Sequence, residues 1–143
     1  MTVSPEAQLW SQLRTNKPIE RRFELTRVEN SAVPGTPDVM VCDDNGDIHL
    51  IELKICTANA VRLSPHQIAF LTRHAHARAW IIVKRTPRSG TATVLVYRGA
   101  DAVALAESGL RGADPVAEFG HPVDWRAVWQ PYPRVDPPVP YIG

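Results

Sequence analysis

Residues 35–54, with the sequence GTPDVMVCDDNGDIHLIELK, constrain the fold of this chain more than any other segment. They contain two short apolar segments separated by Asn45-Gly46. An Asn-Gly dipeptide between apolar segments is the strongest short-range signal for a β-hairpin. We therefore predict two antiparallel strands, at about residues 38–43 and 47–55.

Three charged side chains interrupt this apolar hairpin. Asp38 opens the first strand, and Glu52 and Lys54 lie two residues apart in the second, so Glu52 and Lys54 share a face. Burying an unpaired carboxylate costs several kcal/mol. A divalent cation between two converging carboxylates would compensate the negative charge of both, and oxygen ligands of this kind suit Mg²⁺. A lysine beside such a cation can hold or help deprotonate a water that attacks phosphorus. The pattern therefore predicts a site for phosphodiester hydrolysis.

The register of the hairpin decides whether the two carboxylates meet. A two-residue type I′ turn would place Asp38 opposite Leu53, on the face away from Glu52. A three-residue loop, residues 44–46, would instead pair Asp38 with Glu52 and would place Gly46 at a positive φ. Because a slip of one residue turns every side chain to the other face, we predict the longer loop.

Outside the hairpin, the sequence predicts further helices and strands. Ser4-Pro5-Glu6 is a helix start, and Ser64-Pro65 followed by Gln67 is a second start with an S-x-x-Q capping box. Apolar patterns predict a strand near residues 23–28, strands at 80–85 and 91–98, and short helices near 101–108 and 124–129. The order helix, three strands, helix, two strands predicts an α/β fold in which helices flank a mixed sheet.

Charge is distributed unevenly along the chain. Residues 53–100 contain eight Lys and Arg residues and no Asp or Glu, although the net charge of the whole chain is +1. Such a basic segment is typical of a protein that binds a polyanion such as nucleic acid; a solvated basic face is the alternative interpretation. The candidate phosphate contacts are Arg62, Arg73, Arg78 and Lys84.

The composition is that of an ordinary globular domain, with 143 residues of which 44% are hydrophobic and 22% charged. No apolar run approaches the roughly 18 residues of a transmembrane helix, and the N-terminus lacks the basic start and apolar block of a signal peptide. We therefore expect a cytoplasmic protein without membrane partners. Cys42 and Cys56 are expected to be free thiols, with a disulfide between them as the alternative.

Two motifs in the chain match those of a known family. Gly35-Thr36-Pro37-Asp38, followed by Glu52-Leu53-Lys54, resembles the signature of the PD-(D/E)XK nuclease superfamily. The helix start LSPHQ, residues 63–67, resembles the helix that follows the catalytic strand in the VRR-NUC and Holliday-junction-resolvase-like branch, which includes phage-encoded members. The resemblance spans about residues 5–85 and implies the restriction-endonuclease-like αβββαβ core of that superfamily.

The resemblance also implies roles for residues of this chain. Asp38 and Glu52 would be metal ligands, with the Leu53 carbonyl as a third ligand. Lys54 would be the catalytic lysine, and Gln67 would orient that lysine or a phosphate. Closing the capping box is the alternative role for Gln67, and both roles can hold. The implied cofactor is Mg²⁺ or Mn²⁺.

Two further acidic residues are candidate metal ligands. Glu6 matches an acid in the first helix that many of these resolvases use as an extra ligand. An acid in the first turn of a helix is favourable in any case, which is the alternative account. Glu29 ends the first predicted strand just before the loop and could also reach the metal.

The function implied by the resemblance is that of a metal-dependent DNA endonuclease that selects Holliday junctions or other branched DNA, in DNA recombination and repair. A bare nuclease core reads the shape and backbone of DNA more readily than its base sequence, and symmetric cutting of two strands implies a homodimer. The nuclease domain would span residues 1–110, and residues 111–143 would be a Pro-rich extension packed on the domain or on a partner. The alternatives are a non-catalytic nucleic-acid-binding module of the same fold, and a nuclease that acts on ordinary duplex DNA or on RNA.

Overall fold

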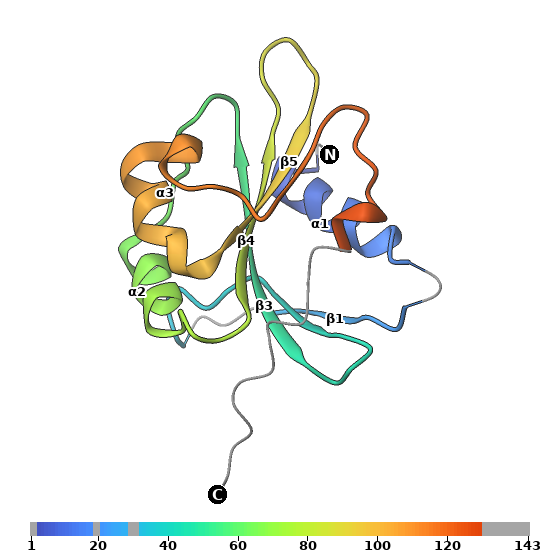
Figure 1. The fold of residues 1–143 in the computed structure, drawn as a ribbon, viewed down its shortest axis with the longest axis vertical. Coiled ribbons are helices and arrows are strands. Elements are labelled where there is room, and N and C mark those ends of the chain that lie inside the picture. The colour runs from blue at the N-terminus through green and yellow to red at the C-terminus, as the bar shows by residue number, and fades with distance from the viewer. Residues whose placement is uncertain (1–2, 19–20, 29–31, 130–143) are drawn as a thin grey trace, which may run out of the picture.

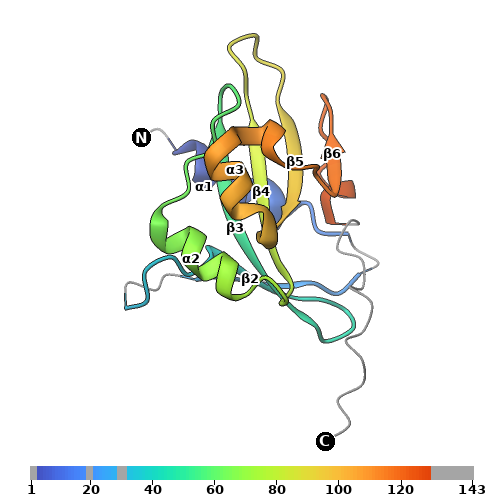
Figure 2. The ribbon, with the colours of Figure 1, turned by 60° about the vertical axis from the view of Figure 1, so that its left-hand side comes forward.

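The computed structural model describes residues 3–18, 21–28 and 32–129. In this part of the chain a six-stranded sheet separates two helical layers (Figure 1 and Figure 2). Helix α1 (Pro5–Thr15) covers one face of the sheet, and α2 (Pro65–Arg73) and α3 (Ala102–Ser108) cover the other. The strands are β1 (Glu24–Arg27), β2 (Val39–Cys42), β3 (Ile48–Cys56), β4 (Ala79–Arg85), β5 (Thr93–Arg98) and β6 (Ala117–Phe119). Short 3-10 helices are η1 (Gly99–Asp101), η2 (Gly109–Gly112) and η3 (Ala127–Trp129).

Strands that are neighbours in the sheet follow the order of the chain, from β1 to β6. Helix α2 carries the chain back between β3 and β4, which are therefore parallel, and the other neighbouring pairs are antiparallel. The predicted α/β fold with a mixed sheet flanked by helices is confirmed at this level. Sequence analysis did not predict β6, because three residues between Pro115 and Pro122 carry too little pattern.

Both predicted helix starts are confirmed. The Ser4 hydroxyl accepts a hydrogen bond from the Ala7 N–H at 3.1 Å. The Ser64 hydroxyl accepts one from the Gln67 N–H at 3.1 Å, and Gln67 Oε1 accepts one from the Ser64 N–H at 2.9 Å. These caps satisfy N–H groups that the first turn of a helix leaves without partners. The second cap also places Gln67 in the first turn of α2.

The strands divide the core into two apolar layers. Ile51 and Leu53 of β3 pack with Leu9 in the layer between the sheet and α1. Strand β4 contributes to both layers, with Ile82 toward α1 and Ile81 toward α2 and α3. Burial on both faces explains why β4 has a continuous apolar sequence without alternation. The even-numbered residues of β3 therefore face the α2 layer.

The segment after η2 packs on the same domain. Trp129 is buried, its indole N–H donates to the Leu13 carbonyl at 3.2 Å, and its ring lies 5.2 Å from the ring of Phe23, centroid to centroid. Together with β6, these contacts bring the described part of the predicted Pro-rich extension onto the domain. The rest of that extension, residues 130–143, lies outside the described residues.

The hairpin has the predicted register. Val39 pairs with Ile51, so the next residues along the two chains, Asp38 and Glu52, lie opposite each other. The Gly46 N–H donates to the carbonyl of Asp43 at 3.0 Å, and Gly46 has a φ of +80°. The three-residue loop and the positive φ of its glycine are therefore confirmed.

Two predictions about the chain as a whole can be compared with the structure. Cys42 and Cys56 both lie in the described part of the chain and are free, as predicted. Among the described residues, no helix is long and apolar enough to cross a membrane.

Candidate active site

The central group of the site is Glu52, which projects from the middle of β3 toward α2. Its exposed fraction is 1%. Oε1 accepts a hydrogen bond from Gln67 Nε2–H at 2.8 Å. Oε2 is also buried and has no hydrogen-bond partner among the described residues. A buried carboxylate oxygen without a donor is costly, so Glu52 either keeps its proton, which lets it form a hydrogen bond with Asp38, or needs a cation as partner when it is ionised.

Asp38 lies across the hairpin from Glu52, on the same face of the sheet. Burial raises the pKa of Glu52 to about 9, and the negative charge of Asp38 adds to this increase, while the positive charge of Lys54 opposes it. The two carboxyl groups therefore repel each other when both are ionised, as the sequence pattern predicts for a pair that shares a cation.

Lys54 and Gln67 complete the cluster. Lys54 Nζ donates to Gln67 Oε1 at 2.9 Å and lies 3.7 Å from Glu52 Oε1. Gln67 Oε1 also accepts the Ser64 N–H of the capping box, so the same amide caps α2 and contacts both charged side chains. The capping-box role of Gln67 is therefore confirmed, and its contact with Lys54 is compatible with the predicted orienting role. Because the helix cap fixes the amide, the amide restrains the Lys54 ammonium beside Glu52.

Gly35 brings the loop before β2 against the start of α2. It has a φ of +86°, and a Cβ at this position would lie 2.2 Å from the carbonyl oxygen of His66. A side chain is therefore excluded both by the backbone conformation and by the close approach. This contact holds the Pro37-Asp38 segment beside the helix turn that carries Gln67.

The backbone N–H and carbonyl of Leu53 point toward the Asp38 side of β3. The Leu50 N–H donates to the carbonyl of Arg78, so even-numbered residues of β3 direct their backbone groups toward β4, and Leu53 directs its own toward β2. Continuing the register places Pro37 opposite Leu53, and proline has no N–H to donate. The Leu53 N–H donates to Asp38 Oδ2 at 2.9 Å instead. The Leu53 carbonyl therefore faces a residue that cannot donate to it, on the Asp38 side of β3.

The two further candidate ligands are placed differently. Glu6 Oε1 lies 3.8 Å from Arg27 Nη2, and the negative charge of Glu6 makes a smaller contribution to the raised pKa of Glu52. Glu29 lies outside the described residues. Within the described residues, no group of three or more His, Cys, Asp or Glu side chains is arranged to hold a metal ion. The candidate metal ligands that the structure brings together are thus the Asp38 and Glu52 carboxyl groups, with the Leu53 carbonyl beside them.

Three of the four candidate phosphate contacts reach the surface. Arg62, in the loop before α2, and Arg73, at the end of α2, are exposed. Arg78 is partly buried, and its Nη2 lies 3.3 Å from Asp47 Oδ1. Arg62 and Arg73 are therefore the more accessible of these contacts.

The position of Lys84 corrects one of the predicted contacts. Its exposed fraction is 8%, its Nζ donates to Gln12 Oε1 at 2.9 Å, and it lies 5.7 Å from the ring centroid of Trp125. Burial lowers the pKa of Lys84. Lys84 projects toward α1, on the face away from Glu52, so we remove it from the nucleic-acid contacts.

Sequence analysis missed a buried hydrogen-bonded chain on the α1 face of the hairpin. Trp80 Nε1–H donates to His49 Nδ1 at 3.0 Å, and His49 Nε2 lies 2.9 Å from Asp43 Oδ2. Because an indole can only donate, Nδ1 is the acceptor and the His49 proton lies on Nε2, toward Asp43. Burial opposes ionisation of Asp43, but hydrogen bonds from His49, Asp47 and Asn45 outweigh it and lower its pKa. The chain ties β4 to the hairpin loop and so supports the register that the site requires.

Comparison with known proteins adds no assignment. No protein-family model matches the chain, and no curated protein matches it. The interpretation of the site therefore rests on its sequence motifs and on the geometry described above.

Proposed function

We propose that the protein is a Mg²⁺- or Mn²⁺-dependent DNA endonuclease that hydrolyses phosphodiester bonds in Holliday junctions or other branched DNA. The observation that carries this proposal is the buried Glu52 carboxylate, with one oxygen lacking a donor among the described residues, beside Asp38 and Lys54. Carboxylates at such a position, with a lysine on the same face, suit metal-assisted phosphoryl chemistry better than they suit a structural role.

The residues present fit a divalent cation. When Glu52 is ionised, its Oε2 has no donor among the described residues, Asp38 lies opposite on the same face, and the Leu53 carbonyl points toward the Asp38 side without a backbone donor in Pro37. These are the oxygen ligands that Mg²⁺ and Mn²⁺ prefer, and neither ion needs an all-protein cage. When bound, the ion would lower the pKa of a water molecule and neutralise charge on the phosphate.

Lys54 then has a defined task. Its ammonium is held by Gln67 Oε1 at 2.9 Å, so it stays on the face of the sheet that the carboxylates occupy. From there it can orient the attacking water and stabilise the charge that develops on the phosphate oxygens. Gln67 acts through Lys54 and Glu52 and is a positioning residue.

The choice of DNA as substrate is supported by the exposed arginines around α2. Arg62 and Arg73 flank the helix that carries Gln67, so a phosphate backbone lying over α2 could contact both. Such contacts read the backbone and its shape rather than the bases. A homodimer would provide the second active site needed to cut two strands symmetrically.

A cleavage assay tests the proposal. The protein would be incubated with a four-way junction, a flap, duplex DNA, single-stranded DNA and RNA, each with Mg²⁺, Ca²⁺ or EDTA. We expect the junction or flap to be cut in Mg²⁺ and not in EDTA. Binding of these substrates without cleavage by any metal would instead favour the non-catalytic binding module, and preferential cutting of duplex DNA or RNA would change the substrate assignment.

A further inference from the structure

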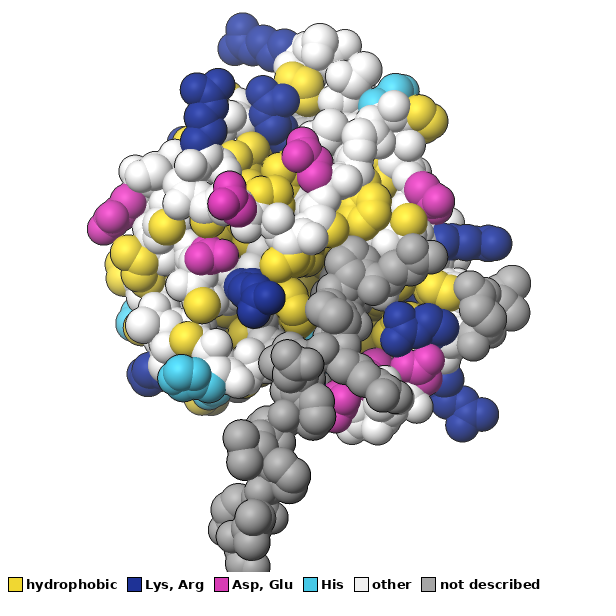
Figure 3. Space-filling view, viewed as in Figure 1, with side chains coloured by type: hydrophobic (Ala, Val, Ile, Leu, Met, Phe, Trp, Pro, Cys, Tyr) yellow, Lys and Arg dark blue, Asp and Glu magenta, His cyan; other side chains and the backbone are white. Residues whose placement is uncertain are grey.

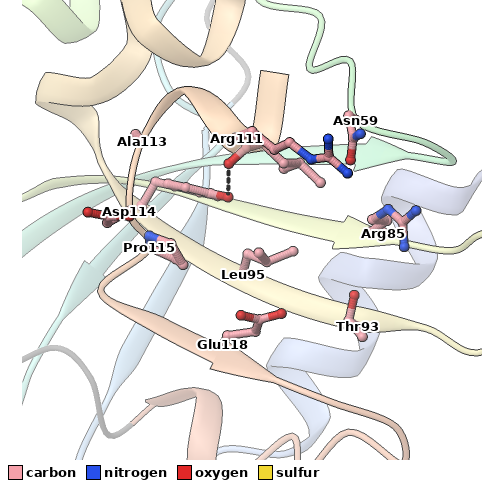
Figure 4. Close-up of a pocket in the computed structure, with 11 residues that line it drawn as sticks. Asn59, Arg85, Thr93, Leu95, Arg111, Ala113, Asp114, Pro115 and Glu118 are labelled. Carbon is pink, nitrogen blue, oxygen red and sulfur yellow. Dashed lines mark hydrogen bonds between the residues drawn. The ribbon is translucent and has the colours of Figure 1, made fainter. Parts of the chain in front are cut away.

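A second concave site lies on the α2 and α3 side of the sheet, toward β5 and β6 (Figure 4). Its volume is about 580 Å³, which is within the range typical of small-molecule sites. The loop after β3, strands β4, β5 and β6, and helix η2 all contribute side chains to it. The pocket is thus assembled from segments far apart in the chain.

One end of this pocket is cationic. Arg111 of η2 and Asn59 of the loop after β3 extend toward each other there, and Arg85 of β4 lies beside them (Figure 4). Arg85 Nε donates to the Ala58 carbonyl at 2.7 Å, which fixes its guanidinium and leaves the terminal NH₂ groups for a ligand. Among the described residues, neither arginine forms an ion pair with a carboxylate. Two guanidinium groups and an amide are a donor set suited to a phosphate group.

The floor of the pocket is apolar. Leu95, Tyr97 and Leu110 form it, and Tyr97 is fully buried. The Tyr97 hydroxyl donates to the Leu110 carbonyl at 3.0 Å, and burial raises the pKa of Tyr97 to about 12, so the phenol stays neutral. Figure 3 shows hydrophobic side chains on the same face, below a group of basic side chains near the β4–β5 connection, with acidic side chains around them. Such a floor suits a planar base or a sugar ring.

The remaining wall is acidic. Asp114 lies at the end of the pocket away from the arginines, and the Glu118 carboxylate points into the pocket from β6 (Figure 4). These carboxylates would repel a second phosphate but can accept hydrogen bonds from hydroxyl or amino groups. The pocket is therefore polarised along its length, with an anion-binding end and a hydrogen-bond-accepting end.

We propose that this pocket binds a nucleoside monophosphate, with its phosphate on Arg85 and Arg111 and its base or sugar donors toward Asp114 and Glu118. The phosphate belongs either to a free nucleotide or to the phosphorylated end of a nucleic-acid strand. Binding of the free nucleotide does not depend on the proposed nuclease function, whereas the strand-end source rests on it.

The topology places the pocket near the candidate active site. Lys54 pairs with Val83 on β4, and Arg85 follows two residues later on the same face. From strand spacing and rise, the Cα atoms of Lys54 and Arg85 are roughly 8 Å apart. A strand end held by Arg85 and Arg111 would thus lie on the same face of the sheet as Glu52 and Lys54, beginning one strand away.

Nuclear magnetic resonance titration of the full ¹⁵N-labelled chain tests the proposal. AMP, adenosine and inorganic phosphate would be added separately without divalent metal, with the amides of Leu110 and Glu118 as reporters and that of Leu9 as a remote control. We expect saturable shifts of the two reporters with AMP, and affinities at least about tenfold weaker for adenosine and for phosphate alone. Arg111→Glu should weaken AMP binding by about tenfold or more, and Arg88→Glu, on the exposed turn before β5, should not.

Each result of these titrations either supports or overturns the proposed nucleotide site. The absence of AMP shifts, equal affinities for AMP and phosphate, or equal effects of Arg111→Glu and Arg88→Glu would each overturn the proposal. Spectra of the variants report whether they fold, and Arg111→Ala provides a milder change at the same position. Oligonucleotides with a 5′-phosphate, a 3′-phosphate or neither identify the source: tighter binding of a phosphorylated end than of AMP assigns the strand end, and the reverse assigns the free nucleotide. AMP binding in a protein that cuts no substrate would separate this site from the proposed nuclease function.

Discussion

Glu52 should make the stability of the metal-free protein depend on pH. Burial, together with the negative charge of Asp38, raises the pKa of Glu52 from its ordinary value of 4.5 to about 9. Between these values the folded state keeps a proton that the unfolded state has released. The contribution of Glu52 to the free energy of unfolding is therefore fully present below the unfolded pKa and is lost as pH rises through the folded pKa.

The size of this effect follows from proton linkage. One proton changes the free energy of unfolding by about 1.4 kcal/mol per pH unit, so the whole interval sets an upper bound of roughly 6 kcal/mol. Because domains are stable by about 5–15 kcal/mol in total, the effect should be easily measured. For a domain of this size we expect the midpoint of thermal unfolding to fall by about 4–6 °C per pH unit between about pH 5 and 8.

Thermal unfolding followed by circular dichroism in EDTA would measure it, with Glu52→Gln and Glu107→Gln for comparison. Glutamine keeps an oxygen that can accept the Gln67 N–H but does not titrate, so Glu52→Gln should flatten the pH dependence and be more stable than the wild type above about pH 8. Glu107 is exposed on α3, and its variant should follow the wild type. Equal slopes for wild type and Glu52→Gln would refute the description of Glu52 as a buried, repelled carboxylate. Added Mg²⁺ should flatten the wild-type slope if the proposed cation site is correct.

Four further predictions concern the site and the loop beside it. Lys54→Ala should abolish cleavage while DNA binding changes by less than about threefold, because the substitution removes one charge among several. Arg88→Ala is the matched control, and near-wild-type cleavage by Lys54→Ala would refute the nuclease assignment. Cleavage should occur in Mg²⁺ or Mn²⁺ but not in Ca²⁺ or EDTA, which a metal series on one junction substrate would establish. Binding should weaken with salt with a log–log slope of roughly −5 if about six phosphates are contacted, and a flat response would exclude a backbone-binding surface. Gly35→Ala should lower the free energy of unfolding by about 2–4 kcal/mol, whereas Gly46→Ala should lower it by about 1 kcal/mol. The difference is expected because a Cβ at Gly35 would also collide with the His66 carbonyl, so equal losses in chemical denaturation would contradict that contact.

The hairpin and the two helix starts could be predicted because their determinants are local. The register follows from the loop residues Asp43 to Gly46, whose hydrogen bonds lie within five residues of one another. Ser64 and Gln67 cap α2 within one turn. Short-range turn and cap chemistry of this kind is readable from sequence. It places Asp38 opposite Glu52, and Gln67 in the first turn of α2, whereas the contact of Gln67 with Glu52 depends on the packing of α2 on the sheet.

The features that sequence analysis missed depend on contacts between distant residues. Lys84 looked like a surface cation, but its position in β4 directs it toward α1. There its Nζ donates a hydrogen bond to Oε1 of Gln12, 72 residues away in the chain. His49 follows the same alternation as Ile51 and Leu53, so its apolar face could have been noticed, whereas its partner Trp80 is 31 residues away. Pairing of β6 with β5 likewise depends on the whole sheet.

The Pro37-Asp38 pair shows how a sequence motif can be explained by backbone pairing. Proline ends the ladder between β2 and β3, because it offers no N–H to the Leu53 carbonyl. The unpaired Leu53 N–H is then taken by the Asp38 carboxylate at 2.9 Å, which turns this side chain toward β3 instead of toward solvent. The same break leaves the Leu53 carbonyl directed at the Asp38 side of the strand, where Glu52 lies opposite Asp38. In this hairpin, the proline directly before Asp38 therefore has two effects. The Asp38 carboxylate is oriented toward β3, and the Leu53 carbonyl receives no hydrogen bond from the opposite backbone position; these are the oxygen ligands that a cation beside Glu52 would need.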